Sequence, residues 1–205
     1  MLNIYVARHG QDEDNRRGIL NGRRNMGLTS LGIEEAISVG KRIAEHQINF
    51  DQIYSSPLKR AMHTAELIAS EAGGPQPQII EDLIERDFGV MTGLPHSSII
   101  PMCSPDVIIS EHVDYFLNPE NGETFPQLIE RGKRVINDLH IAHPEGNILL
   151  VTHGDTGMMM YNEFYKLEWM KTLKDFYFHN AELILLSKDT SPENPHVFRI
   201  NDYKK

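Results

Sequence analysis

Only one cysteine, Cys103, occurs among the 205 residues of the chain. No disulfide can therefore form within the chain, and this cysteine usage is typical of a reducing cytoplasm. The sequence also lacks any apolar run near the roughly 20 residues that span a bilayer. Its first residues, MLNIYVARHG, have neither the basic segment nor the long apolar segment of a signal peptide. We therefore expect a cytoplasmic protein without a membrane partner.

Basic residues are scarce compared with acidic ones: 20 Lys and Arg stand against 29 Asp and Glu, for a formal net charge of −9. An acidic surface repels nucleic-acid backbones, so DNA or RNA is not expected as a partner. A phosphate site in such a protein requires a local basic pocket. Internal repeats, low-complexity segments and long linkers are absent too, and the length suits one large core. We expect a single domain over residues 1–205.

Short apolar runs of strand length alternate with stretches of helical periodicity. Strands are predicted at residues 3–7, 52–55, 78–81, 147–152, 181–186 and 196–200. Helices are predicted at residues 28–46, 57–73 and 125–140, and from residue 154 onward. Thr29 or Ser30 is placed to cap the first helix, and Ser56 with Pro57 to open the second. This alternation predicts an α/β fold, a three-layer α/β/α sandwich with a mainly parallel central sheet.

Residues 94–121 do not follow this alternation and hold four of the eleven prolines. We interpret residues 94–125 as an inserted cap that sets specificity, a loop with one short helix. The segment contains no lysine or arginine. It offers only His96 and His112, among apolar residues such as Ile99, Ile100 and those at 107–109. Such a cap would shelter an apolar or neutral leaving group.

Histidines and arginines follow three of the predicted strands. Arg8 and His9 end the first strand, His153 ends the 147–152 strand, and Arg60 follows the 52–55 strand by one helical turn. The carboxyl ends of parallel strands meet at one edge of a sheet, where ligands bind. Each histidine alone also fits an ordinary packed or solvent-facing residue. Together, the four residues suit phosphoryl transfer, which requires fixed positive donors around three phosphate oxygens.

The chemistry of such a site makes two further demands. A neutral histidine nitrogen can attack phosphorus if the other ring nitrogen is held, for example by the carbonyl of Gly10. The leaving alcohol then needs a proton, best supplied by a nearby carboxylic acid.

The sequence RHGQ at residues 8–11 resembles the N-terminal signature of the histidine phosphatase superfamily, branch 1, whose members are phosphoglycerate mutase-like. The resemblance continues in SSPLKRAMHTA (55–65), LIERDFGVMTG (83–93), NGETF (121–125) and VTHGD (151–155). It implies a phosphoglycerate mutase-like fold with His9 as phosphoryl acceptor and Glu85 as general acid, for which Asp87 is the rival. The implied phosphate-binding residues are Arg8, Arg60 and His153, with Asn15 and Gly22 at the rim of the pocket. The amide of Gly154, at a predicted helix start, would add a phosphate donor. No cofactor and no metal ligand are expected.

Phosphatase and mutase chemistry share the phosphohistidine. A mutase must hold a doubly anionic intermediate, and the cap offers no cation for it. We therefore predict a histidine acid-type phosphatase: a metal-independent phosphomonoesterase that acts on a small phosphorylated metabolite. Phosphoglycerate mutase-type transfer is the alternative, because some of Arg16, Arg17, Arg23, Arg24 and Arg86 could reach a second anionic group.

Features of the sequence also raise two other classes of function. A non-catalytic protein that binds phosphorylated ligands is a remote alternative, since every expected catalytic residue is present. A metalloenzyme is suggested by ten histidines and by the acidic stretch at residues 12–14, but no HxH or HExxH pattern occurs. His140 and His143 lie one turn apart near a helix C-terminus, where the helix dipole explains them. The chain is compatible with a homodimer.

Overall fold

Six strands form a central sheet in the order β3-β2-β6-β1-β7-β8 in the computed structural model, which describes residues 1–199. The strands are β1 (Leu2–Arg8), β2 (Gln52–Ser55), β3 (Gln78–Ile79), β6 (Gly146–Thr152), β7 (Leu183–Leu186) and β8 (His196–Phe198). Strands β3, β2, β6 and β1 are parallel, whereas β7 and β8 each pair antiparallel with the strand before them in the sheet. The predicted α/β fold with a mainly parallel sheet is confirmed.

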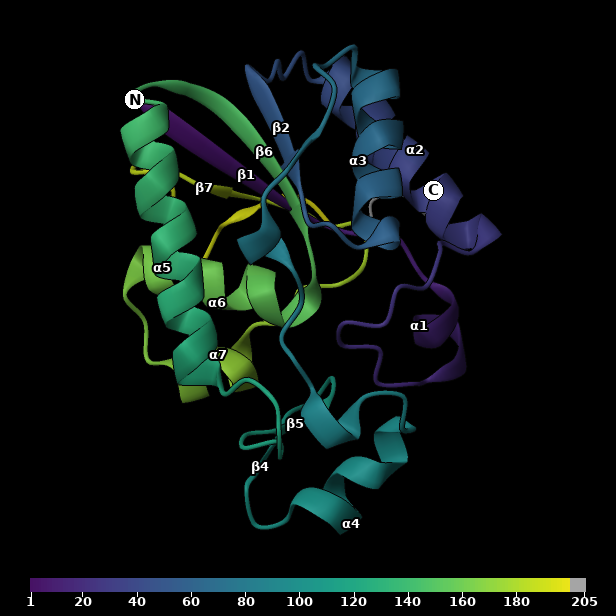
Figure 1. The fold of residues 1–205 in the computed structure, drawn as a ribbon. Coiled ribbons are helices and arrows are strands. Elements are labelled where there is room, and N and C mark those ends of the chain that lie inside the picture. Colours follow the sequence, from purple (N-terminus) through teal and green to yellow (C-terminus); the bar gives the residue numbers. More distant parts are fainter. Residues whose placement is uncertain (200–205) are drawn as a thin grey trace.

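Helices cover both faces of the sheet (Figure 1). Helices α2 (Ser30–Glu45) and α3 (Lys59–Ala72) pack on one face, and α5 (Phe125–Ala142) and α6 (Gly154–Tyr165) on the other. Alternate residues of β1 belong to different cores: Ile4 and Val6 pack with α5 and α6, whereas Tyr5 and Ala7 pack with α2 and α3. The parallel strands are thus buried on both sides, as is usual when helices cross over between them. Two short helices, α1 (Glu13–Arg17) and α7 (Trp169–Asp175), complete this part of the fold.

Several predicted boundaries need correction. The second helix starts at Lys59, not at Pro57, because the hydroxyl of Ser56 accepts from the amide of Leu58 and also contacts His153 instead of capping a helix. Strand β3 ends at Ile79, because the chain turns into a 3₁₀ turn, η1 (Glu81–Leu83). Strand β7 starts at Leu183, not at residue 181. The strand predicted at 196–200 is observed as β8, but it ends at Phe198, and residue 200 lies outside the described residues. Thr29 caps α2, as one of the two predicted choices.

The segment predicted as the cap, residues 94–125, contains a 3₁₀ turn η3 (His96–Ser98), a short helix α4 (Ile99–Cys103) and a hairpin of β4 (Val107–Ile109) and β5 (Asp114–Phe116), and its last residue is the first of α5. The short helix was predicted; the hairpin, α1, α7, η1 and a further turn, η2 (Gly89–Met91), were not. The cap is anchored by a small core of Leu20, Phe88, Met91, Ile99 and Phe116. Across residues 1–199, no helix is both long and apolar enough to cross a membrane.

Candidate active site

Three neighbouring strands end at the same level of the sheet. In the register, Arg8 lies opposite Thr152, and Ser55 lies opposite Val151. The residue that directly follows β1 is His9, the one after β6 is His153, and the one after β2 is Ser56. The rings of His9 and His153 meet edge to face, with their centroids 5.0 Å apart. The expected meeting of the two histidines at one edge of the sheet is confirmed.

Arg60, in the first turn of α3, lies between these histidines with no exposed surface. Its Nε–H donates to Nε2 of His9 at 3.0 Å and to Nδ1 of His153 at 3.2 Å. Its two terminal nitrogens donate to the carbonyls of Gly22 at 2.8 Å and Arg24 at 2.6 Å. The planar guanidinium is thereby fixed in orientation. Gly22 holds Arg60 through its backbone; its φ is +46°, and a Cβ there would lie 3.0 Å from the ring of Phe88.

The hydrogen bonds of His9 define which ring nitrogen carries the proton. Its Nδ1 lies 2.7 Å from the carbonyl of Gly10, which can only accept, so Nδ1 is the donor. Its Nε2 lone pair then faces the Nε–H of Arg60. Burial, followed by the charges of Arg60 and Arg8, holds the pKa of His9 well below its ordinary value. His9 is therefore a neutral imidazole with its nucleophilic nitrogen at the centre of the site.

His153 is neutral for the same reasons. Burial is the largest cause that lowers its pKa, and the charge of Arg60 is the next. Its Nε2 lies 2.7 Å from Oγ of Ser56, which fixes the ring from the opposite side. Two neutral imidazoles thus share one arginine N–H.

The guanidinium of Arg8 has one N–H, at Nε, without a hydrogen-bond acceptor among the described residues. Its Nη1 donates to the carbonyl of Phe178 at 2.6 Å, but its buried Nε makes no hydrogen bond within the part of the chain that the structure describes. Gly154, the first residue of α6, lies directly against it, since a Cβ on Gly154 would be 3.3 Å from the guanidinium carbon of Arg8. An unsatisfied arginine N–H beside the N-terminus of a 12-residue helix is a natural binding point for an anion.

Glu85 lies across the site and is 5% exposed. Its Oε1 accepts from the amides of Arg86 at 2.8 Å and Thr156 at 3.1 Å, and from Oγ1 of Thr156 at 3.0 Å. Its Oε2 meets only the amide of Asp155, at 3.3 Å. Burial, and then the negative charge of Asp155, raises the pKa of Glu85. A buried carboxyl with a raised pKa is suited to donate a proton.

Asp87, the rival for the acid role, is directed elsewhere. Its Oδ1 accepts from the amide of Gly89 at 2.9 Å, and its Oδ2 pairs with Nη1 of Arg23 at 3.2 Å. It borders a shallow surface hollow with Arg23, Glu123 and Arg131. The geometry favours Glu85.

A narrow cavity of about 80 Å³ lies between the sheet edge and the cap. On the sheet side it is lined by Arg8, Asn15, Glu85 and Gly154, and on the cap side by His96, Val113, Asp114, Tyr115 and Phe116; the remaining lining residues are Leu20, Asn21, Arg86, Phe88, Asp155, Met158 and Tyr177. His9, Arg60, His153 and Gly22 do not line this cavity. His9 is 2% exposed, and Arg60 and His153 are fully buried.

Sequence reasoning missed a supporting set of polar residues. Asp12 pairs with Arg60, 3.3 Å from Oδ2 to Nε, and caps α1 in a capping box with Asn15. Asn180 donates to the carbonyl of His9 at 2.8 Å and to Oδ1 of Asn15 at 3.1 Å. Thr156 supports Glu85, as described above. The spacing of Asp12 and Asn15 is a usable helix-start signal, but nothing local in the sequence marks Asn180 or Thr156.

The acidic stretch that suggested a metal site is engaged with arginines. Besides Asp12, Asp14 pairs with Arg24 at 2.8 Å, and Glu13 pairs with Arg16 at 2.8 Å. Among residues 1–199, no group of three His, Cys, Asp or Glu side chains is arranged to hold a metal ion.

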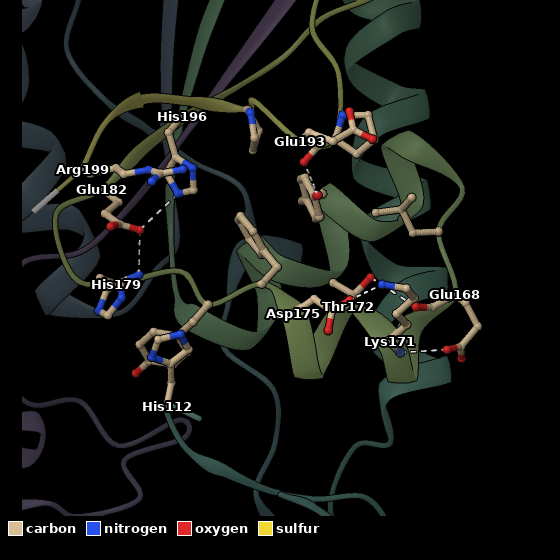
Figure 2. Close-up of a pocket in the computed structure, with 16 residues that line it drawn as sticks. His112, Glu168, Lys171, Thr172, Asp175, His179, Glu182, Glu193, His196 and Arg199 are labelled. Atoms are coloured by element: carbon tan, nitrogen blue, oxygen red, sulfur yellow. Dashed lines mark hydrogen bonds and ion pairs between the residues drawn. The ribbon is translucent and has the colours of Figure 1, made fainter. Parts of the chain in front are cut away.

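A second, larger hollow of about 930 Å³ lies beside α7 and the C-terminal strands (Figure 2). Figure 2 shows His112, His179 and His196 on one side of it, with Nε2 of His196 3.4 Å from Oε2 of Glu182. It contains none of the residues around Arg60, and only Tyr177 lines both hollows. Its size alone does not make it the catalytic site.

Comparisons with known proteins agree with this geometry. A model of the histidine phosphatase superfamily (branch 1) matches residues 4–202. The 2,3-bisphosphoglycerate-dependent phosphoglycerate mutase of Rhizobium etli (strain CIAT 652) is 33% identical over 161 residues, which make up 75% of this chain and 74% of that protein. Some other mutases of the same name match over only 62% of their own length.

Two solved structures share the fold. The α-ribazole phosphatase of Shigella flexneri aligns with a TM-score of 0.73 and 25% identity, covering 89% of both chains. The phosphoserine phosphatase of Entamoeba histolytica, solved with 3-phosphoglyceric acid, aligns with a TM-score of 0.75 and 25% identity, covering 96% of this chain and 94% of that one.

Proposed function

The chain belongs to the histidine phosphatase superfamily (branch 1), and from that premise we propose that it is a phosphomonoesterase that works through a phosphohistidine on His9. One observation carries the proposal: a neutral His9 whose Nδ1 is held by the Gly10 carbonyl and whose Nε2 points at a fixed arginine. The reaction as proposed uses only side chains and backbone amides of this chain and needs no metal or cofactor.

In the first proposed step, the Nε2 lone pair of His9 attacks phosphorus and the bond to the alcohol oxygen breaks. Glu85 gives its proton to the leaving oxygen. A phosphate oxygen accepts the Nε–H of Arg60, which faces His9 before the reaction, and Arg8 and the amide of Gly154 bind the other oxygens. These donors are fixed before the reaction, so they stabilise the developing charge without reorganising. His153 has its Nδ1 bonded to Arg60 and its Nε2 bonded to Ser56, so in its neutral form it orients Arg60 and does not donate to the phosphate.

In the second step, a water molecule attacks the phosphorus of the phosphohistidine. The carboxylate of Glu85 accepts a proton from that water, the P–N bond breaks and inorganic phosphate leaves. Glu85 thus alternates between acid and base and returns to its protonated form. Its single weakly bonded oxygen, Oε2, is the one we assign to carry the proton.

Mutase-type transfer is the second candidate, and the names and identities of the sequence relatives favour it. The charges around the cavity favour hydrolysis. Of the five arginines considered for a second anionic group, only Arg86 lines the cavity, and its Nε is 2.7 Å from Oδ2 of Asp155. Three aromatic rings also enclose the guanidinium of Arg86, at 4.2–5.0 Å. Arg16, Arg23 and Arg24 are paired with carboxylates elsewhere.

We further propose a small phosphorylated metabolite as substrate. A cavity of about 80 Å³ is far below the ~300–1,000 Å³ of typical ligand pockets. We place the protein in the cytoplasm, because its one thiol, that of Cys103, lies against Sδ of Met91 at 3.6 Å and has no second cysteine to pair with.

The test is phosphate release from a panel of phosphomonoesters in excess chelator, including p-nitrophenyl phosphate and phosphoglycerates. Wild type is compared with His9→Ala and with His140→Ala, a matched control on the outside of α5. We expect release by wild type and the control and none by His9→Ala, and a phosphoenzyme that is labile to acid should be trapped only when His9 is present. Normal turnover by His9→Ala refutes the mechanism. Release of no phosphate together with interconversion of phosphoglycerates establishes the mutase, and binding without either activity establishes a non-catalytic ligand-binding protein.

A further inference from the structure

The cavity has two chemically different ends. The sheet side carries Arg8, Glu85 and Gly154, which the proposed reaction uses. The cap side carries Asp114 and His96, for which that reaction has no role. The alcohol part of a substrate that reaches His9 must face this cap side, because the phosphoryl group occupies the other end.

Asp114 brings a negative charge to the cap side. It begins β5, is half-buried, and makes no ion pair or side-chain hydrogen bond with any residue in the range 1–199. The other acidic residues of the cavity are occupied: Asp155 by Arg86, and Glu85 by four hydrogen bonds. Asp114 is therefore the carboxylate in the cavity without a partner.

His96 does not neutralise Asp114. Burial lowers its pKa, and the charge of Arg8 acts in the same direction, whereas the charges of Asp155 and Asp114 oppose them without prevailing. His96 is thus an uncharged neighbour at neutral pH. The cations of the cavity are Arg8, at the phosphate end, and Arg86, paired with Asp155. Among the cap-side residues that line the cavity, Asp114 is therefore the one that carries a formal charge.

The sequence alone predicts an apolar or neutral leaving group under the cap. Because Asp114 lines the cavity, we propose instead that the alcohol part of the substrate carries a positively charged amino group, which binds Asp114. The aromatic ring of Tyr115 lines the same cavity, and aromatic rings attract ammonium groups. A carboxylate or second phosphate beside Asp114 would instead face a like charge. The small cavity restricts the alcohol to a few heavy atoms. This inference rests on the proposed phosphatase function and adds the class of its substrate.

The test uses three esters of similar length: 2-aminoethyl phosphate, propyl phosphate and phosphoglycolate, which end in a cation, a neutral methyl and a carboxylate. We expect kcat/KM to fall in that order for the wild type, with a spread of at least ~10-fold between the two ends. Asp114→Asn should compress the spread, and Asp114→Lys should reverse it. Glu111→Gln, which removes an exposed carboxylate in the turn between β4 and β5, should keep the spread.

A flat or reversed order in the wild type overturns the inference, as does an unchanged spread in Asp114→Asn. Hydrolysis of p-nitrophenyl phosphate is measured in parallel, with His9→Ala as the blank. It distinguishes a failure of the Asp114 assignment from a failure of the proposed phosphatase function. If that ester is hydrolysed through His9 while the three-ester order is flat, only the assignment of Asp114 fails. If no ester is hydrolysed, the phosphatase function fails and the substrate class falls with it.

Discussion

Replacing Glu85 by glutamine removes one transferable proton and keeps the shape of the side chain. The amide oxygen can retain the three hydrogen bonds that Oε1 accepts, at 2.8–3.1 Å. The amide nitrogen then faces the N–H of Asp155, which now donates to Oε2 at 3.3 Å. Leaving that one buried donor unpaired costs about 1–3 kcal/mol. We therefore expect Glu85→Gln to fold, with a correspondingly lower free energy of unfolding.

The catalytic loss should depend on the leaving group. An alkoxide needs a proton as it leaves, and general acids contribute about 10²–10⁴-fold to such steps. Nitrophenolate leaves without one, so its loss should stay below about 10-fold. The measured quantity is kcat/KM, because it covers only the steps up to phosphoryl transfer to His9. Hydrolysis of the phosphohistidine, which is common to all esters, cannot mask the difference in that ratio.

The matched control is Asp87→Asn, which removes a carboxyl two residues away that is bonded to Arg23 and Gly89 outside the cavity. It should leave the ratio of alkyl to nitrophenyl activity unchanged. Equal losses of Glu85→Gln on both esters would refute the reasoning. A leaving-group-dependent loss in Asp87→Asn would transfer the acid role to that residue.

Three further predictions concern the same site. Asp155→Asn should lower the pKa of Glu85, because the substitution removes a negative charge that raises this pKa and leaves the charge of Arg86 unpaired nearby. The alkaline limb of the kcat/KM profile, where Glu85 loses its proton, should therefore move to lower pH. An alkaline limb that stays in place contradicts this prediction. Arg60→Lys should reduce kcat by about 10²–10³-fold, because a lysine cannot make the four hydrogen bonds of the guanidinium together. Steady-state kinetics at saturating substrate measures kcat, and a near-normal value would show that the planar guanidinium is not needed. Burial keeps His9 and His153 neutral in the folded chain, whereas the unfolded chain protonates both below about pH 6.5. Their contribution to stability is therefore complete above pH 6.5 and is lost as the pH falls toward the folded-state pKa values, at up to about 2.7 kcal/mol per pH unit for two protons. Denaturant titrations of wild type and His153→Gln should show a slope smaller by one proton in the variant, and identical slopes would count against neutral burial.

The sheet edge was predictable because parallel strands impose a common geometry on their carboxyl ends. Strands that terminate in His9 and His153 had to bring those residues together once their neighbours in the sheet were fixed, and the alternation of strand and helix indicated a parallel sheet. Thr29 was predictable as a cap for the same kind of reason, since its hydroxyl accepts from the amide of Gly32 one turn later.

The cap hairpin could not be predicted from local pattern. Each of its strands has only three residues, and β5 begins with an aspartate, a residue that strands usually avoid. Its stability comes from distant partners: Phe116 meets Phe88 edge to face at 5.1 Å, and Tyr115 meets Phe125 at 6.0 Å. Ser56 shows the same limit. It stands in a favourable capping position, but His153, almost a hundred residues away, competes for its hydroxyl.

The arrangement of charge explains how an acidic protein can handle phosphate. The carbonyls of Gly22 and Arg24 and the carboxylate of Asp12 hold Arg60 beside His9. Burial lowers the pKa of His9 most, and the positive charge of Arg60 adds to it, so the imidazole is neutral before any substrate arrives. The same charge attracts the phosphoryl group and stabilises the negative charge that develops on its oxygens. A lysine or an exposed arginine would be screened by water at this distance, whereas a fully buried guanidinium acts in a low dielectric. In the proposed reaction, therefore, burial of Arg60 both activates the nucleophile and binds the group that it attacks. Loosening the Gly22 turn that holds Arg60 should harm both functions at once, even though Gly22 does not line the cavity.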